Sequence, residues 1–110
     1  MAKRDRVTPS SGNVFADLEL PDADERLAKA ELVRIIRRIL RERDLTQREA
    51  GELLGLRQPD VSDLLRGNLT RFSRERIERS LLLLGMDVSI HVAPKGRRRS
   101  RARLTVEVPA

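Results

Sequence analysis

The sequence contains no cysteine, no tryptophan and no tyrosine, and it has a single histidine, His91, and two phenylalanines. Without cysteine the chain can form no disulfide, offers no thiolate nucleophile and cannot hold zinc through sulfur. One histidine is too few for a histidine-based metal site or a histidine-dependent hydrolase. The shortage of aromatic rings leaves no platform on which single-stranded bases could stack. These absences favour a binding protein over an enzyme, and we expect neither a cofactor nor a metal ion.

The sequence also lacks a segment that would carry the chain to or through a membrane. Its first residues, MAKRDRVTPSSGN, do not contain the apolar stretch of a secretory signal. The longest run of leucines, residues 81–84, is far too short to span a bilayer. We therefore expect a cytoplasmic protein.

Charge is plentiful but unevenly distributed: 36% of the 110 residues are charged and 39% are hydrophobic. The formal net charge is +6, yet residues 94–110 hold six bases and one acid, whereas residues 1–93 are almost neutral. The total therefore does not indicate a uniformly basic surface. The basic tail could bind nucleic acid, meet an acidic protein or stay unbound. If it binds DNA, its phosphate contacts should steepen the salt dependence and leave base preference unchanged.

The apolar pattern predicts a helical domain over residues 21–85, preceded by a flexible arm at residues 1–20. We expect the first helix to begin with Asp22 as N-cap and Glu25 as its reciprocal partner, and to end near Arg43. Its apolar stripe consists of Ala28, Leu32, Ile35, Ile36 and Ile39. Four arginines lie largely off this stripe: Arg34, Arg37, Arg38 and Arg41. A solvated helix face is a simpler interpretation of them than a track of phosphate contacts.

Residues 45–67 follow the spacing of two short helices joined by a tight turn: LTQREAGELLGLRQPDVSDLLRG. Thr46 and Glu49 form a capping box before the first helix, and Gly55 supplies the positive φ of the turn. The proline of QPD suits the first turn of the second helix, where its missing N–H costs nothing. Gly51 is the small residue that lets the two helices touch. Five further positions should be buried: Ala50, Leu54, Leu56, Val61 and Leu64. This register predicts a DNA-binding helix-turn-helix.

A further helix is expected over residues 74–84, with Ser73 as its cap and Gly85 at its end. Its buried stripe should consist of Ile77, Leu81 and Leu84. Leu82 and Leu83 widen the apolar face beyond what one small core requires, which indicates a partner for this helix.

Two segments alternate apolar and polar residues with the period of a β-strand: residues 88–92 and 104–108. The first lies in segment 86–93, where His91 should be exposed, and the second lies in the basic tail, residues 94–110. One or two short strands make no stable sheet alone. We therefore expect a homodimer in which strands pair between the two copies. The candidate dimer interface consists of Leu82, Leu83, Val88, Ile90 and Val92.

The helix-turn-helix segment resembles the XRE (Cro/repressor-like) group, and its flanks resemble the HigA-type antitoxins of type II toxin–antitoxin modules. The flanking stretches are SGNVFADLELPDADERLAKAEL at residues 11–32 and FSRERIERSLLLLGMDVSIHV at residues 72–92. The arginine-rich tail falls outside the resemblance. The resemblance implies a mainly α fold: a five-helix-type, lambda-repressor-like helix-turn-helix domain with a short C-terminal dimerisation strand.

The resemblance also implies that a homodimer lays residues 58–66 of each copy in the major groove of a palindromic operator. The implied DNA-binding residues are Gln47, Arg57, Gln58, Asp60, Ser62, Asp63, Arg66 and Arg71. Among these, Gln58 could pair with adenine and Arg57 with guanine. Gln47 would hold a phosphate and brace Gln58, and the last two arginines would also meet phosphates.

Two of these residues, Asp60 and Asp63, put negative charge on a surface that must approach phosphates. They could serve as solvent-facing caps or as ion partners of Arg57 and Arg66. They could equally repel wrong base sequences, because an unfavourable contact also discriminates between sites. Both interpretations stay open.

The function implied by the resemblance is that of a sequence-specific repressor. More specifically, the chain would be a HigA-like antitoxin that neutralises a RelE/HigB-like mRNA interferase toxin and represses its own operon. The toxin contact is expected on residues 14–40, which are apolar and remote from the reading helix. One alternative is a stand-alone XRE-family or phage-type regulator without a toxin. Another is an interaction module that uses the helix-turn-helix only as a scaffold.

Overall fold

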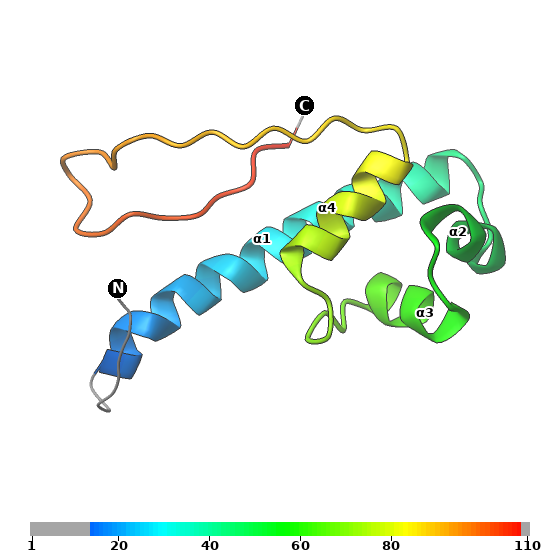
Figure 1. Ribbon diagram of the computed structural model, residues 1–110, viewed down its shortest axis with the longest axis horizontal. Coiled ribbons are helices and arrows are strands. Elements are labelled where there is room, and N and C mark those ends of the chain that lie inside the picture. The colour runs from blue at the N-terminus through cyan, green and yellow to red at the C-terminus, as the bar shows by residue number, and fades with distance from the viewer. Residues whose placement is uncertain (1–13, 109–110) are drawn as a thin grey trace.

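The computed structural model describes residues 14–108 of the chain, with side chains from residue 22 onward. It contains four helices in this range: α1 (Val14–Glu42), α2 (Gln47–Leu54), α3 (Gln58–Arg66) and α4 (Arg74–Leu83). Figure 1 shows α1 as a long rod, with α4 against its C-terminal part and α2 and α3 gathered at one end of the molecule. Residues 86–108 leave α4, turn back and return without regular structure. No helix in the described range is long and apolar enough to cross a bilayer.

The core forms where the apolar stripe of α1 meets α4 and the α2–α3 pair. Four of the five stripe residues predicted for α1 are buried, and Ile35 is partly buried against the core. Val33 and Leu40, outside the predicted stripe, are also buried. The predicted stripe of α4 is buried as well: Ile77, Leu81 and Leu84. Each large aliphatic side chain removed from water in this way contributes roughly 1.5–3 kcal/mol to stability.

The predicted helix ends are confirmed at the short helices. Thr46 Oγ1 accepts a hydrogen bond from the Glu49 backbone N–H at 3.1 Å, and Glu49 Oε1 accepts one from the Thr46 N–H at 2.9 Å. The Thr46 backbone N–H lowers the pKa of Glu49, because it stabilises the carboxylate form. Ser73 Oγ accepts from the Arg76 N–H at 3.1 Å and caps α4 in the same way. Gly67 ends α3 with φ +82°, a conformation that glycine adopts without strain.

The start of α1 differs from the prediction. The helix begins at Val14, so Asp22 lies inside it and does not act as its N-cap. Residues 14–20, which were expected in the arm, are therefore helical, and residues 1–13 of that arm lie outside the described residues. Pro21 removes only one backbone donor from the helix, and residues 14–20 before it contain no glycine or second proline. A helix already nucleated downstream can therefore extend past it.

Two arginines tie α4 to α1 near the two ends of α4. Arg74 Nη1 lies 2.8 Å from Glu25 Oε1 on α1, and its Nε lies 3.1 Å from Glu78 Oε2 one turn along α4. Arg43 Nη2 donates to the Leu84 carbonyl oxygen at 2.7 Å, which satisfies a carbonyl at the C-terminus of α4. Glu25 thus joins two helices and does not cap one.

The C-terminal strands and the five-helix count were wrong. Residues 86–108 contain neither a strand nor a fifth helix. Their alternating pattern does not support a helix, and a short β-segment needs a neighbouring strand to satisfy its backbone groups. The side chains of Ile90 and Val92 are 76% and 87% exposed. Met86, Val88 and Val106 are the residues of this segment that pack partly against the core.

Candidate nucleic-acid interface

The crossing of α2 and α3 is fixed by two glycines. A Cβ on Gly51 would lie 2.9 Å from the Leu56 carbonyl oxygen and 3.3 Å from Val61 Cγ2, so only glycine fits without a shift. Gly55 has φ +68° and turns the chain between the helices. Four of the five predicted interior positions are buried, and Leu56 is partly buried. The helix-turn-helix geometry predicted from the spacing is confirmed.

The predicted contact residues lie in three environments. Five are exposed: Gln47, Arg57, Gln58, Arg66 and Arg71. Asp60 and Ser62 are partly buried, and Asp63 is buried. Arg57 is the N-cap of α3 but its side chain makes no capping hydrogen bond, so it is available to a ligand. Among the described residues no hydrogen bond joins Gln47 to Gln58, the bracing contact that the resemblance implied.

Asp63 holds two exposed arginines at the C-terminal end of α3. Its Oδ2 accepts from Arg71 Nη2 at 2.6 Å, and its Oδ1 accepts from Arg66 Nη2 at 3.0 Å. The hydrogen bond from Arg71, followed by that from Arg66, lowers the pKa of Asp63 against the opposing effect of burial. The Asp63 side chain is only 11% exposed, whereas those of Arg66 and Arg71 are 69% and 70% exposed. Both carboxylate oxygens are therefore occupied by arginines whose side chains are largely exposed to solvent.

Asp60 extends this cluster toward α4. Its Oδ2 lies 3.4 Å from Arg76 Nη2, and its Oδ1 lies 3.9 Å from Arg71 Nη2. The guanidinium of Arg76 also lies over the ring of Phe72, 4.7 Å from its centroid, a cation–π arrangement. Asp60 therefore pairs with arginines beyond α3, and not with Arg57 as considered from the sequence. Arg76 was missed, because nothing in the sequence connects positions 16 residues apart.

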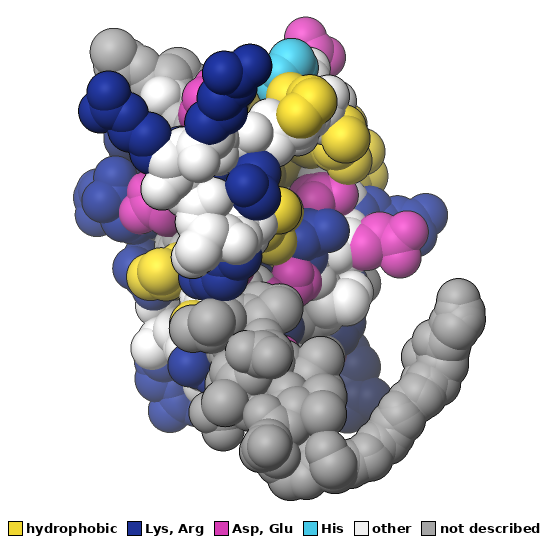
Figure 2. All heavy atoms as spheres, turned by 90° about the vertical axis from the view of Figure 1, so that its left-hand side faces the viewer, with side chains coloured by type: hydrophobic (Ala, Val, Ile, Leu, Met, Phe, Trp, Pro, Cys, Tyr) yellow, Lys and Arg dark blue, Asp and Glu magenta, His cyan; other side chains and the backbone are white. Residues whose placement is uncertain are grey.

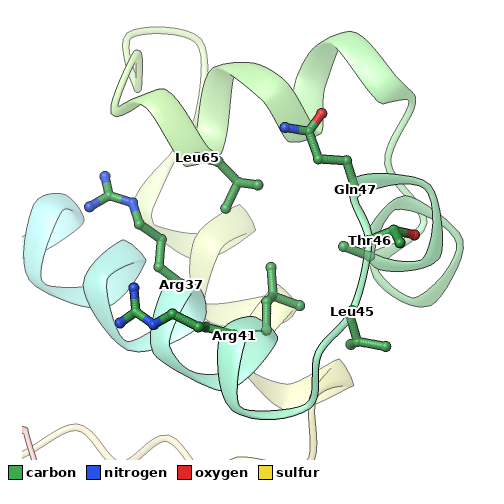
Figure 3. Close-up of a pocket in the computed structure, with 8 residues that line it drawn as sticks. Arg37, Arg41, Leu45, Thr46, Gln47 and Leu65 are labelled. Carbon is green, nitrogen blue, oxygen red and sulfur yellow. The ribbon is translucent and has the colours of Figure 1, made fainter.

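A second basic group lies beside the N-terminus of α2. Arg37 and Arg41, one turn apart on α1, line a shallow pocket of about 260 Å³ together with Gln47. Figure 3 shows both arginines reaching to the same side of α1, with Leu65 of α3 above them. The Arg37 Nε is buried without a hydrogen-bond partner among the described residues. The i, i+4 spacing of these arginines was the available signal, but their nearness to Gln47 depends on how α2 packs on α1.

The remaining predicted residues lie outside this group. Leu82 and Leu83 are 56% and 49% exposed on α4, and they lie near the exposed Ile90 and Val92 in sequence. Val88 is partly buried, and His91 is exposed as expected. In Figure 1 the segment after α4 runs along the side of α4 that faces away from α3. Segment 86–93, with three of the five candidate dimer residues, therefore lies on a different side of α4 from α3.

Comparison with known proteins agrees with this geometry. The helix-turn-helix domain family matches residues 14–93, well over half of the chain. A solved structure provisionally assigned to the XRE family of transcriptional regulators is 37% identical, with a TM-score of 0.75. The match covers 81% of this chain and 100% of the other chain. No curated protein sequence matches. The chain therefore belongs to the helix-turn-helix family of DNA-binding domains and is an XRE-type transcriptional regulator. Regulators of this kind are normally not enzymes.

Proposed function

We propose that the protein is a sequence-specific DNA-binding repressor that acts as a homodimer. The observation that carries this proposal is the cluster on α3, in which buried Asp63 holds the exposed guanidinium groups of Arg66 and Arg71. Arginines held in one orientation by a buried carboxylate lose less side-chain freedom when they bind a phosphate. The same helix begins with the exposed side chains of Arg57 and Gln58.

Base reading is proposed for the first residues of α3. Arg57 and Gln58 are exposed, and neither side chain takes part in a hydrogen bond within the described part of the chain. Arginine can pair bidentately with guanine and glutamine with adenine in the major groove. Ser62, one turn further along, is partly exposed and would contact either a base or a phosphate. Asp60 is occupied by arginines, so its proposed role is to hold Arg71 and Arg76 in place.

Phosphate contacts are proposed for two groups of arginines. Arg66 and Arg71 would supply them at the C-terminal end of α3. At the other group, Arg37 and Arg41 stand beside Gln47 and the N-terminus of α2, where backbone N–H groups also favour an anion. Replacing both Arg37 and Arg41 with glutamine should therefore reduce the salt dependence of DNA binding by about 1.8 in slope, because each lost phosphate contact removes about 0.9.

The homodimer is proposed on the apolar surface formed by Leu82, Leu83, Val88, Ile90 and Val92. Four of these five side chains are large and exposed in the single chain. Large apolar side chains exposed in this number and close in sequence are typical of a protein interface. A second copy would also offer segment 86–93 the neighbouring strand that it lacks within one chain. Two reading helices related by a two-fold axis would then face a palindromic operator.

The more specific proposal is a HigA-like antitoxin that binds a RelE/HigB-like mRNA interferase and represses its own operon. Residues 14–40 are the proposed toxin contact. In support, Leu27 on α1 is 66% exposed, and the N-terminal half of α1 projects away from α2 and α3. A toxin bound there would leave the helix-turn-helix free. The alternative is a stand-alone XRE-family or phage-type regulator that uses the same DNA surface.

One experiment separates these two functions. The protein is tested by mobility shift on DNA from upstream of its own gene, with and without the product of the adjacent gene. The antitoxin function is supported if the protein shifts the DNA, the adjacent gene product causes a second shift, and the two proteins co-purify. Replacing Leu27 with aspartate should abolish the second shift alone, and the same change at exposed Leu53 on α2 serves as the control. If the protein shifts the DNA and the adjacent gene product causes no second shift, the stand-alone regulator is the function that remains.

A further inference from the structure

The basic segment after residue 94 is fastened to α1. Asp24 Oδ2 accepts a hydrogen bond from Arg101 Nη1 at 3.2 Å and another from the Leu104 backbone N–H at 3.1 Å. The Asp24 side chain is only 16% exposed in this contact. The Arg101 hydrogen bond, and after it that from Leu104, lowers the pKa of Asp24, so the carboxylate stays charged at neutral pH. The returning arm of the segment is thus held on the N-terminal half of α1.

The turn that Asp24 secures presents arginines to solvent. The Arg99 N–H donates to the Gly96 carbonyl oxygen at 3.2 Å and closes the turn. Among the bases of residues 95–103, only Arg101 takes part in an ion pair within the described residues. The exposed bases without such a partner are Lys95, Arg97, Arg98 and Arg103. Uncompensated positive charge at this density attracts a polyanion.

The turn lies far from the reading helix of the same chain. Figure 1 shows it at one end of the long axis, whereas α2 lies at the opposite end and α3 lies beside it. The longest extent of the molecule is 46 Å. Figure 2 looks directly at the end with the turn and shows Lys and Arg side chains gathered over it. The turn therefore lies too far from α3 to contact the base pairs that α3 of the same copy reads.

Residues 95–103 also lack what a protein partner would need. Ala102 is their only apolar residue. Stable protein interfaces depend on a desolvated centre of apolar or aromatic side chains, whereas phosphate contacts depend on charge and counterion release. The composition of the turn therefore favours a nucleic-acid backbone over an acidic protein.

We propose that Arg97, Arg98 and Arg103, held in place by the Asp24 contacts, form a second phosphate-binding surface for double-stranded DNA. It engages DNA other than the base pairs that α3 of the same copy reads, so the protein can join two duplex segments. The segment lies outside residues 14–93 matched by the helix-turn-helix family, so the surface is an addition to the family fold. The proposal rests on the DNA-binding function proposed above for α3.

The test uses the full chain and two short duplexes from upstream of its gene, one with a donor and the other with an acceptor fluorophore. The wild-type protein should bring them together and give energy transfer that disappears with added salt. The triple variant R97Q/R98Q/R103Q should lose this transfer, while R97K/R98K/R103K, which keeps the charge, should retain it. On one short duplex, the glutamine variant should bind with the affinity and salt slope of the wild type.

Three outcomes would overturn the proposal. Transfer that survives the glutamine changes would show that other residues join the duplexes. A salt slope reduced by about 2.7 on the single short duplex would place the three arginines on the DNA that α3 reads. The absence of energy transfer with the wild-type protein, together with an unchanged salt slope in the glutamine variant, would leave an acidic protein as the occupant. The variant Gln58→Ala distinguishes this failure from failure of the reading helix, because it should relax the sequence preference at one base position and keep energy transfer between duplexes.

Discussion

Asp63 Oδ2 and Arg71 Nη2 lie 2.6 Å apart, and this contact joins α3 to the loop before α4. It fixes the loop relative to the reading helix and holds the Arg71 guanidinium at the surface. The second oxygen of the same carboxylate holds Arg66 at 3.0 Å. One buried acid therefore positions two of the bases that are proposed to meet phosphates.

The first prediction concerns this acid. Replacing Asp63 with asparagine keeps the size of the side chain but removes the charge that orients both arginines. We expect weaker binding to all DNA sequences, a salt slope reduced by up to about 1.8, and an unchanged base preference. Titration of the upstream duplex and of a scrambled duplex at several salt concentrations measures all three. If base preference changed while the salt slope stayed the same, Asp63 would contact a base.

The second prediction concerns pH. The arginines lower the pKa of folded Asp63 below its ordinary value of 3.8, so the unfolded chain takes up a proton at a higher pH than the folded chain. The stabilisation is fully present above the unfolded value and is lost as the pH falls through the lowered folded value. Thermal unfolding of wild type and Asp63→Asn should therefore differ by a constant amount above about pH 5, and the difference should vanish in stronger acid. A difference that grew on acidification would contradict the pairing.

The third prediction tests the helix crossing. Replacing Gly51 with alanine places a Cβ 2.9 Å from the Leu56 carbonyl oxygen, so the two helices must move apart. We expect a loss of about 1–3 kcal/mol in the free energy of unfolding. Gly96→Ala is the matched control, because the nearest atom to its new Cβ is an arginine end 3.8 Å away. Chemical denaturation of both variants measures the effect. If Gly51→Ala were as stable as Gly96→Ala, the two helices would not make their close contact at Gly51.

The fourth prediction concerns the homodimer. Aspartate at both Leu82 and Leu83 should weaken association by about 3 kcal/mol, roughly a hundredfold, because two apolar side chains would no longer be buried. The fold of one chain should survive, since both residues are at least 49% exposed in it. Sedimentation measurements over a range of concentrations report the change, and Leu53→Asp serves as the control. A wild-type protein that stays monomeric at every concentration would exclude this interface.

The sequence predicted those parts of the fold that depend on neighbouring residues. The Thr46–Glu49 capping box, the turn at Gly55 and the end of α3 at Gly67 each follow from a few adjacent side chains, and all three are confirmed. The start of α1 was predicted wrongly because Pro21 was expected to mark it. Pro21 removes one hydrogen bond, and the helical structure on both sides of it outweighs this loss.

Contacts between distant residues could not be predicted in this way. Whether Asp63 faces DNA or faces Arg71 depends on the path of a loop that no local pattern encodes. Segment 88–92 has the alternation of a strand, but strand formation requires a neighbour that alternation does not supply. The partnership of Asp24 with Arg101, 77 residues later, depends likewise on where the chain returns.

The central claim is that exposed Arg57 and Gln58 on α3 read a specific DNA sequence. The most direct test is the ratio of affinities for the upstream duplex and a scrambled duplex of equal length, measured at one fixed salt concentration. We predict a ratio of about 1,000 or more for the wild type. Gln58→Ala should reduce specific binding by about 1–3 kcal/mol and relax the preference at one base position. Equal affinity of the wild-type protein for both duplexes would contradict the account.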